Sequence, residues 1–271
     1  MTEEQWLSCT DPIRMVEFLR GNPTSEDTVT WWNSRRQFEE ASQGNDRQFR
    51  LFACACCRRI WDRIPAACNR DAVAAVEDYL DGRLSGQALE RAFVASSAVE
   101  YREDGSRRSE PGYWIVKDLG RGFYKMTAAA SALLIASQVI CMADEEYGRE
   151  AGHVFNSCFY AAAGVFLSRF HWPLPLPTAV EAECAAQAAL LRCLFGNPVR
   201  SVTIEPRWRT ANVVDLAHAI YQGNEFSPSQ MAVLADALLD AGAAGELAEH
   251  CRNDGPHIKG CWVVDLILGK A

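Results

Sequence analysis

The sequence predicts an all-α protein, a compact multi-helix bundle of about ten helices. Two observations favour this class. Helix start and stop residues recur along the chain, and only brief stretches alternate as strands do. The 271 residues are 49% hydrophobic, which is enough to bury a substantial core. We expect a single domain over residues 1–271, with strand limited to short segments near 113–117, 199–205 and 262–268.

The first hundred residues carry clear helix signals. Thr2 and Gln5 have the spacing of a capping box, in which two side chains satisfy the free N–H groups at a helix start. Asp11 and Pro12 supply an N-cap and a first-turn proline for a second helix, and Gly21 is placed to end it. Further helices are expected over 45–64, 69–80 and 85–101.

The segment 102–126 is interpreted as an inserted loop. It starts with the polar run EDGSRRSEPG and continues with aromatic residues and glycines, a composition typical of a surface loop or an irregular lid. Two uncharged stretches follow, 126–143 and 151–168. Both are rich in alanine and contain polar residues, so we expect a helix hairpin in a soluble core and no membrane span.

Helix signals return in the last third of the chain. Thr178 begins a helix that Gly196 ends. Ser227 and Pro228 begin another. Helices are also expected over 210–222 and 244–252. The final run CWVVDLILG is short and apolar, and it fits either a buried strand or a last helix.

Charge and terminal composition limit the partners and the compartment. The 35 acidic residues outnumber 27 basic ones, and the net charge of −8 argues against binding to nucleic acid. The N-terminal residues contain neither the basic nor the apolar region of a signal peptide, so a cytoplasmic location is expected. In that compartment the eleven cysteines are expected to stay reduced.

Two cysteine-containing segments together predict a metal site. In RLFACACCRRIW, helical spacing places Cys54 and Cys57 on one face. In HCRNDGPHIKGCW, glycines allow a turn tight enough to bring Cys251, His257 and Cys261 together. Thiolates and neutral imidazoles suit tetrahedral zinc, so these five residues are the candidate zinc ligands. The terminal segment alone is one ligand short of a closed site unless His250 also turns inward.

Two other interpretations of the same residues stay open. The cysteines fill helix interfaces as small apolar side chains, and His257 satisfies a buried turn. Alternatively, Cys261 or Cys251 is the nucleophile of a hydrolase or transferase, with His257 as base and Asp265 orienting the imidazole. In that case the 102–126 loop would cover the pocket.

Several blocks of the chain resemble a bacterial family of paralogous cytoplasmic proteins that has no established activity. The resemblance is carried by the opening MTEEQWLSCTDPIRMVEFLRG, by RLFACACCRRIW, LLRCLFGNPVRSV and VVDLAHAIY, and by the closing HCRNDGPHIKGCWVVDLILGK. It implies that the cysteine helix and the terminal block occur together in one protein, which favours their contact in space. It implies no catalytic residue.

These observations lead to one expected function and one alternative. We expect a helical binding or interaction module in which the cysteine helix docks on the terminal segment, with a structural zinc ion as the expected cofactor. Its ligand would be a protein partner or a small molecule that the sequence does not identify. The alternative is the Cys/His hydrolase or transferase.

Overall fold

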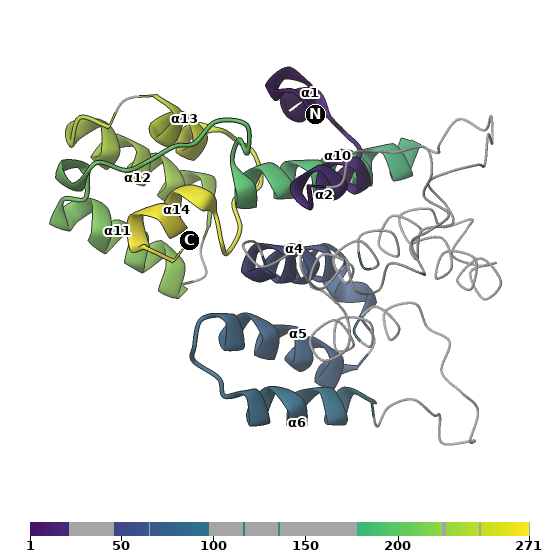
Figure 1. Cartoon of the computed structure of the whole chain (residues 1–271). Coiled ribbons are helices and arrows are strands. Elements are labelled where there is room, and N and C mark those ends of the chain that lie inside the picture. The colour runs from purple at the N-terminus through teal and green to yellow at the C-terminus, as the bar shows by residue number, and fades with distance from the viewer. Residues whose placement is uncertain are drawn as a thin grey trace, which may run out of the picture. The chain divides into compact units, whose positions relative to one another are not determined.

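The computed structural model describes residues 1–21, 46–64, 66–97, 116, 135, 178–223, 226–243 and 245–270. Within these ranges all regular structure is helical, with ten α-helices and two short 3-10 helices (Figure 1), so the predicted all-α class is confirmed. Of the three candidate strand segments, 262–268 is a helix and 199–205 contains no strand. The third, 113–117, lies outside the described residues except for Val116.

Contacts between residues divide the chain into two units. Unit 1 consists of residues 1–10 and 188–271, and unit 2 consists of residues 11–187. Helix α10 (Thr178–Phe195) belongs to unit 2 as far as Gln187 and to unit 1 from Ala188 onward. The expected loop at 102–126 and the uncharged stretches 126–143 and 151–168 lie outside the described residues, apart from Val116 and Ile135. Among the helices that are described, none is long and apolar enough to cross a membrane.

Unit 2 is built from helices that pack through apolar faces. Its elements are α2 (Pro12–Leu19), α4 (Asp46–Arg59), η2 (Trp61–Arg63), α5 (Ala67–Leu80), α6 (Gly86–Ser97) and the first part of α10. A short turn after α5 reverses the chain, so α5 and α6 lie side by side (Figure 1). Phe52, Val73 and Val76 are completely buried. Burial of such side chains is the main source of stability in a helical unit.

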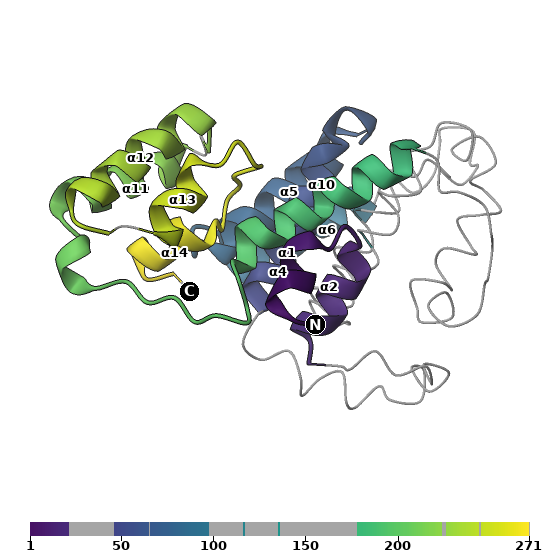
Figure 2. The same cartoon turned by 90° about the horizontal axis from the view of Figure 1, so that it is seen from above.

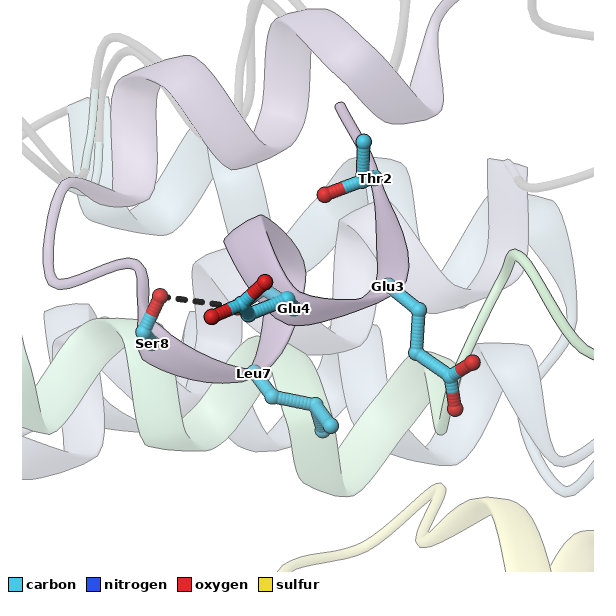
Figure 3. Close-up of a pocket in the computed structure, with 5 residues that line it drawn as sticks. All are labelled: Thr2, Glu3, Glu4, Leu7 and Ser8. Atoms are coloured by element: carbon cyan, nitrogen blue, oxygen red, sulfur yellow. Dashed lines mark hydrogen bonds between the residues drawn. The ribbon is translucent and has the colours of Figure 1, made fainter.

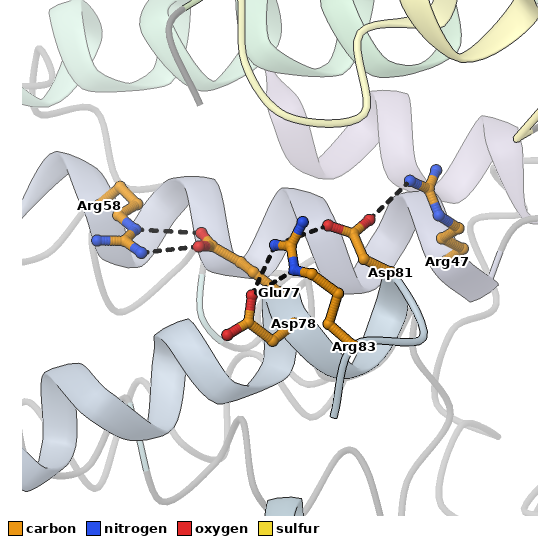
Figure 4. A network of polar contacts seen from close by, with 6 residues as sticks. All are labelled: Arg47, Arg58, Glu77, Asp78, Asp81 and Arg83. Atoms are coloured by element: carbon orange, nitrogen blue, oxygen red, sulfur yellow. Dashed lines mark hydrogen bonds and ion pairs between the residues drawn. The ribbon is translucent and has the colours of Figure 1, made fainter. Parts of the chain in front are cut away.

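Several charged residues on α4, on α5 and in the turn after α5 form ion pairs. Arg58 donates two hydrogen bonds to Glu77, at 3.1 and 2.7 Å. Farther along, Arg83 contacts Asp81 at 3.0 Å, and Arg47 lies 3.7 Å from the same carboxylate (Figure 4). These ion pairs link α4 to α5 and to the turn that follows α5.

Unit 1 brings the N-terminal helix together with the C-terminal helices. Its elements are α1 (Glu3–Ser8), the last part of α10, η5 (Pro206–Trp208), α11 (Ala211–Gly223), α12 (Pro228–Asp240), α13 (Glu246–Arg252) and α14 (Trp262–Leu268). Helices α11 to α14 pack around one apolar core, as both views show (Figures 1 and 2). Cys193, Cys251 and Cys261 are part of that core.

The predicted helix starts are found in the structure. The Thr2 hydroxyl accepts a hydrogen bond from the Gln5 N–H, and the Gln5 side chain accepts one from the Thr2 N–H. The Asp11 carboxylate accepts from the N–H groups of Ile13 and Arg14. These caps satisfy backbone donors that lack a partner inside the helix.

Candidate metal centre

Four side chains in unit 1 meet to form a candidate metal centre. Cys193, His250, His257 and Cys261 each offer one donor atom, and all four atoms lie within 4.8 Å of one another. They come from four places in the chain: the end of α10, the end of α13, the loop after α13, and the residue before α14. The group therefore joins segments that are far apart in sequence.

Cys193 lies in the last turn of α10. The helix ends at Phe195, and Gly196 follows with a left-handed φ of 60°. Glycine adopts this conformation without the steric cost that other residues have there. Cys193 is only 2% exposed, and its position at the end of α10 brings its thiol to the terminal segment of the chain.

His250 and His257 flank a short loop. His250 is in the last turn of α13, and the loop from Asn253 to Gly260 returns the chain toward it. The two imidazole rings meet edge to face, with 5.0 Å between their centroids. Gly260, with a φ of 89°, makes the turn that leads into Cys261.

The hydrogen bonding of His257 assigns its metal-binding atom. Nε2 lies 3.0 Å from the Asn253 carbonyl oxygen, and because a carbonyl only accepts, Nε2 carries the proton. The other ring nitrogen, Nδ1, is buried and has no hydrogen-bond partner among the described residues. A metal-binding histidine commonly donates its second N–H to a carbonyl in this way. Nδ1 is thus the ring nitrogen that remains to bind a cation.

Cys261 is the central residue of the cluster. It is fully buried, and its Sγ lies 3.2 Å from Nε2 of His250. Burial acts to raise the pKa of Cys261, but the thiol of Cys193 and the two imidazoles stabilise the thiolate and bring the pKa well below its ordinary value. The lowered pKa favours the thiolate, which is the form of cysteine that binds metals.

The pKa values of Cys193 and His257 are raised, whereas that of Cys261 is lowered. Burial and the nearby sulfur of Cys261 raise the pKa of Cys193, so this second thiol keeps its proton while no cation is present. Burial acts to lower the pKa of His257, but the Cys261 thiolate and the Asn253 carbonyl raise it. A cation at the centre would replace the Cys193 proton, so metal binding would be accompanied by proton release.

The cluster is slightly wider than the donor set of a tetrahedral zinc site. Zinc bonds to sulfur and nitrogen at about 2.3 and 2.0 Å, so the donors in a tetrahedron are roughly 3.3–3.8 Å apart. The observed limit of 4.8 Å requires only a small contraction.

The structure places the predicted ligands in two groups. His257 and Cys261 are in the cluster, and His250 does turn inward to join them. Cys251 is buried in the same core but is not one of the four grouped residues. Cys54 and Cys57 are buried in unit 2, and their part in a metal site stays a prediction. The four donors of unit 1 form a complete set without these three cysteines.

Cys193 is the ligand that the sequence analysis did not identify. The residue belongs to the block LLRCLFGNP, one turn before the glycine that ends α10. The sequence feature that could have pointed to Cys193 is its position just before a helix stop. Side chains at the end of a helix can approach a loop that is distant in sequence. That signal alone does not say which loop.

Asp265 and a surface depression bear on the enzyme alternative. Asp265 is buried in α14, and its N–H donates to the Cys261 carbonyl at 2.9 Å. The group that orients His257 is the Asn253 carbonyl, and the catalytic role of Asp265 stays a prediction.

An open depression elsewhere in unit 1 is lined by five residues of the N-terminal segment (Figure 3). These are Thr2, Glu3, Glu4, Leu7 and Ser8, none of which is a cysteine or a histidine.

Comparison of the chain with protein-family models, with curated proteins and with solved structures finds no match. The chemistry of this centre is therefore argued from its own residues.

Proposed function

We propose that this protein is a helical binding module that holds one zinc ion through Cys193, His250, His257 and Cys261. The observation that carries the proposal is the convergence of four donor atoms within 4.8 Å, together with a buried Nδ1 of His257 that has no hydrogen-bond partner among the described residues. A buried polar atom without a partner is unfavourable by about 1–3 kcal/mol. A bound cation removes that penalty.

The donor set favours zinc over other common cations. Two thiolates and two imidazoles are soft or borderline ligands, which magnesium and calcium do not select. With both cysteines ionised, their two negative charges balance those of Zn²⁺, so the complex is neutral in an apolar core. Four protein ligands also leave no open coordination position, which is typical of a structural site.

The proposed role of the ion is to join parts of unit 1. Helices α13 and α14 have seven residues each, and isolated helices of that length are not stable in water. The ion would connect both of them to the end of α10. The surface of the stabilised unit would then recognise a protein or a small molecule. We place the protein in the cytoplasm, where reducing conditions would keep buried cysteines such as Cys193, Cys251 and Cys261 in the thiol state.

Metal analysis tests the zinc proposal directly. Full-length protein purified under reducing conditions without chelator is expected to contain about one equivalent of zinc. Replacement by Co²⁺ is expected to give the visible absorption of a tetrahedral site with two thiolate ligands. Protein that contains no zinc, and does not bind added Zn²⁺ or Co²⁺, would contradict the proposal.

A second candidate function is suggested by the Cys261 thiolate. Its lowered pKa and its contact with His250 are features of a cysteine nucleophile. Two observations count against this role: Cys261 is 0% exposed, and a second thiol and a second imidazole surround it. Alkylation of metal-free protein at neutral pH separates the functions. A nucleophile should react at Cys261 far faster than at any other cysteine, whereas slow reaction at every buried thiol would exclude it.

A further inference from the structure

The N-terminal helix is held in unit 1 by a small set of contacts. Helix α1 has only six residues, and a helix of that length does not persist in water without packing. Its single buried side chain is Trp6, which is 0% exposed and whose indole N–H donates to the Gly196 carbonyl at 2.9 Å. Among the described residues, Trp6 is therefore the main apolar contact between α1 and the end of α10.

The other contacts of α1 come from the same part of unit 1. The Arg192 guanidinium donates to the Trp6 carbonyl at 3.1 and 3.2 Å and also to the Cys9 carbonyl. Asn197 donates to the Glu3 carboxylate at 2.8 Å, and Arg200 forms an ion pair with it at 2.8 Å. These partners lie between residues 192 and 200, so they immediately surround the metal ligand Cys193.

A second chain of contacts connects α1 to the other ligands. The Trp262 ring packs against Gly196 so closely that a Cβ at that glycine would lie 3.1 Å from it. Trp262 directly follows Cys261, and its ring centroid is 5.3 Å from that of His250. Cys193 thus lies one turn before Gly196, which accepts from the Trp6 indole, whereas Cys261 and His250 adjoin Trp262, which packs against that glycine.

We propose that metal binding at the cluster controls the docking of residues 1–10. The inference rests on the proposed function, because it assigns a regulatory consequence to the same site. With the ion bound, Cys193 is held against Cys261 and His250, and the adjacent residues 192–200 keep the geometry that Trp6 requires. Without the ion, that geometry is no longer constrained and the N-terminal segment dissociates, while α11 and α12 remain folded on their own apolar contacts.

The coupling must act in both directions. If zinc favours the docked segment, then the docked segment favours zinc by the same factor. A change in α1 that weakens docking should therefore lower the affinity for zinc, although no residue of α1 binds the metal. A merely structural role of Trp6 in α1 would not produce this effect.

Hydrogen exchange of the full-length protein, followed by mass spectrometry, tests the first direction. Zinc-loaded protein is compared with protein treated with chelator and reductant. We expect residues 2–10 to exchange roughly ten-fold faster, or more, in the metal-free protein and to recover when zinc is restored. Residues 67–80 of unit 2 and residues 211–240 of unit 1 should keep their rates.

Zinc competition with a chromophoric chelator tests the second direction. Trp6→Ala is expected to weaken zinc binding roughly ten-fold. Trp6→Phe keeps most of the packing and removes only the indole donor, and it should weaken binding roughly five-fold. The matched control is Leu7→Ala, a change on the same helix at a side chain that is 57% exposed, and it should leave the affinity unchanged.

The possible outcomes separate this inference from the function on which it rests. Protein that binds one equivalent of zinc, yet exchanges residues 2–10 at the same rate with and without it, overturns the control of docking and leaves the zinc site intact. Loss of protection throughout unit 1 on metal removal also overturns it, since the release would then not be selective. Protein that binds no zinc overturns both proposals.

Discussion

The two units of this protein place buried cysteines in different chemical surroundings. In unit 2, Cys54, Cys56 and Cys57 lie in the interior of α4, where burial is the largest cause that raises the pKa of each thiol, to about 12 for Cys57. In unit 1, Cys261 is equally buried, yet its pKa is lowered well below the ordinary value. Burial alone therefore does not determine the state of a thiol in this chain.

The difference lies in what surrounds each sulfur atom. Next to Cys54 and Cys57 is the Glu77 carboxylate, a negative charge that further raises their pKa. Next to Cys261 are two imidazoles and a second thiol, all of which stabilise a thiolate. Cysteine serves as a small apolar side chain in the first setting and as a candidate metal ligand in the second.

Replacing one cysteine by serine in each unit tests this contrast most strongly. Cys261→Ser is expected to reduce bound zinc from about one equivalent to less than about a tenth. Cys57→Ser places a hydroxyl in an apolar site and destabilises unit 2 by about 2 kcal/mol, but it should keep the zinc. Metal analysis and calorimetry measure both effects. Equal zinc content in the two variants would invalidate the contrast.

Replacing one left-handed glycine by alanine in each unit gives the next largest expected effect. Gly196→Ala introduces a left-handed alanine and a Cβ 3.1 Å from the Trp262 ring, and we expect a destabilisation of about 3 kcal/mol in unit 1. Gly82→Ala in unit 2 has a similar φ of 71° but meets nothing within 4 Å. It should lower stability by only about 1 kcal/mol. Urea unfolding distinguishes them, and equal losses would mean that the contact with Trp262 contributes nothing.

Local sequence signals predicted most of the helices because the responsible contacts are local. Thr2 with Gln5 and Asp11 with Pro12 act within one helical turn, so their spacing is sufficient to place a helix start. The run 262–268 was ambiguous because a short run of mostly apolar residues fits either period. The structure gives a helix, which ends at Gly269 with a left-handed φ of 68°.

The candidate metal ligands also differ in whether their contacts are local or distant in sequence. His257 and Cys261 could be predicted because one short loop holds both, and glycine allows the turn. Cys193 could not, because its proximity depends on how the end of α10 packs against α13 and α14. Helical spacing shows which residues share a face of one helix, as for Cys54 and Cys57, but it carries no information on which distant segment meets that face.

Ion pairs offer a third comparison between the units. Arg58→Met leaves the Glu77 carboxylate, 11% exposed, without its partner, and should destabilise unit 2 by about 2 kcal/mol. Arg252→Met in unit 1 breaks a pair with Asp236 whose side chains are 54% and 67% exposed. Its effect should stay below about 1 kcal/mol, because solvent already screens that pair. Denaturant midpoints report both values. If the exposed pair proved the more important, desolvation would not govern these interactions.

The smallest expected effect concerns the helix cap at the start of unit 2. Asp11→Ala removes the carboxylate that accepts from Ile13 and Arg14, at 2.9 and 3.2 Å, and should cost about 1 kcal/mol. Asp11→Asn keeps an accepting oxygen and is expected to recover most of that loss. Both variants should retain full zinc content, because Asp11 belongs to unit 2 whereas the four candidate ligands belong to unit 1. A fall in zinc content on loss of this cap would show that the two units are energetically coupled, and the metal centre could then no longer be treated as a property of unit 1 alone.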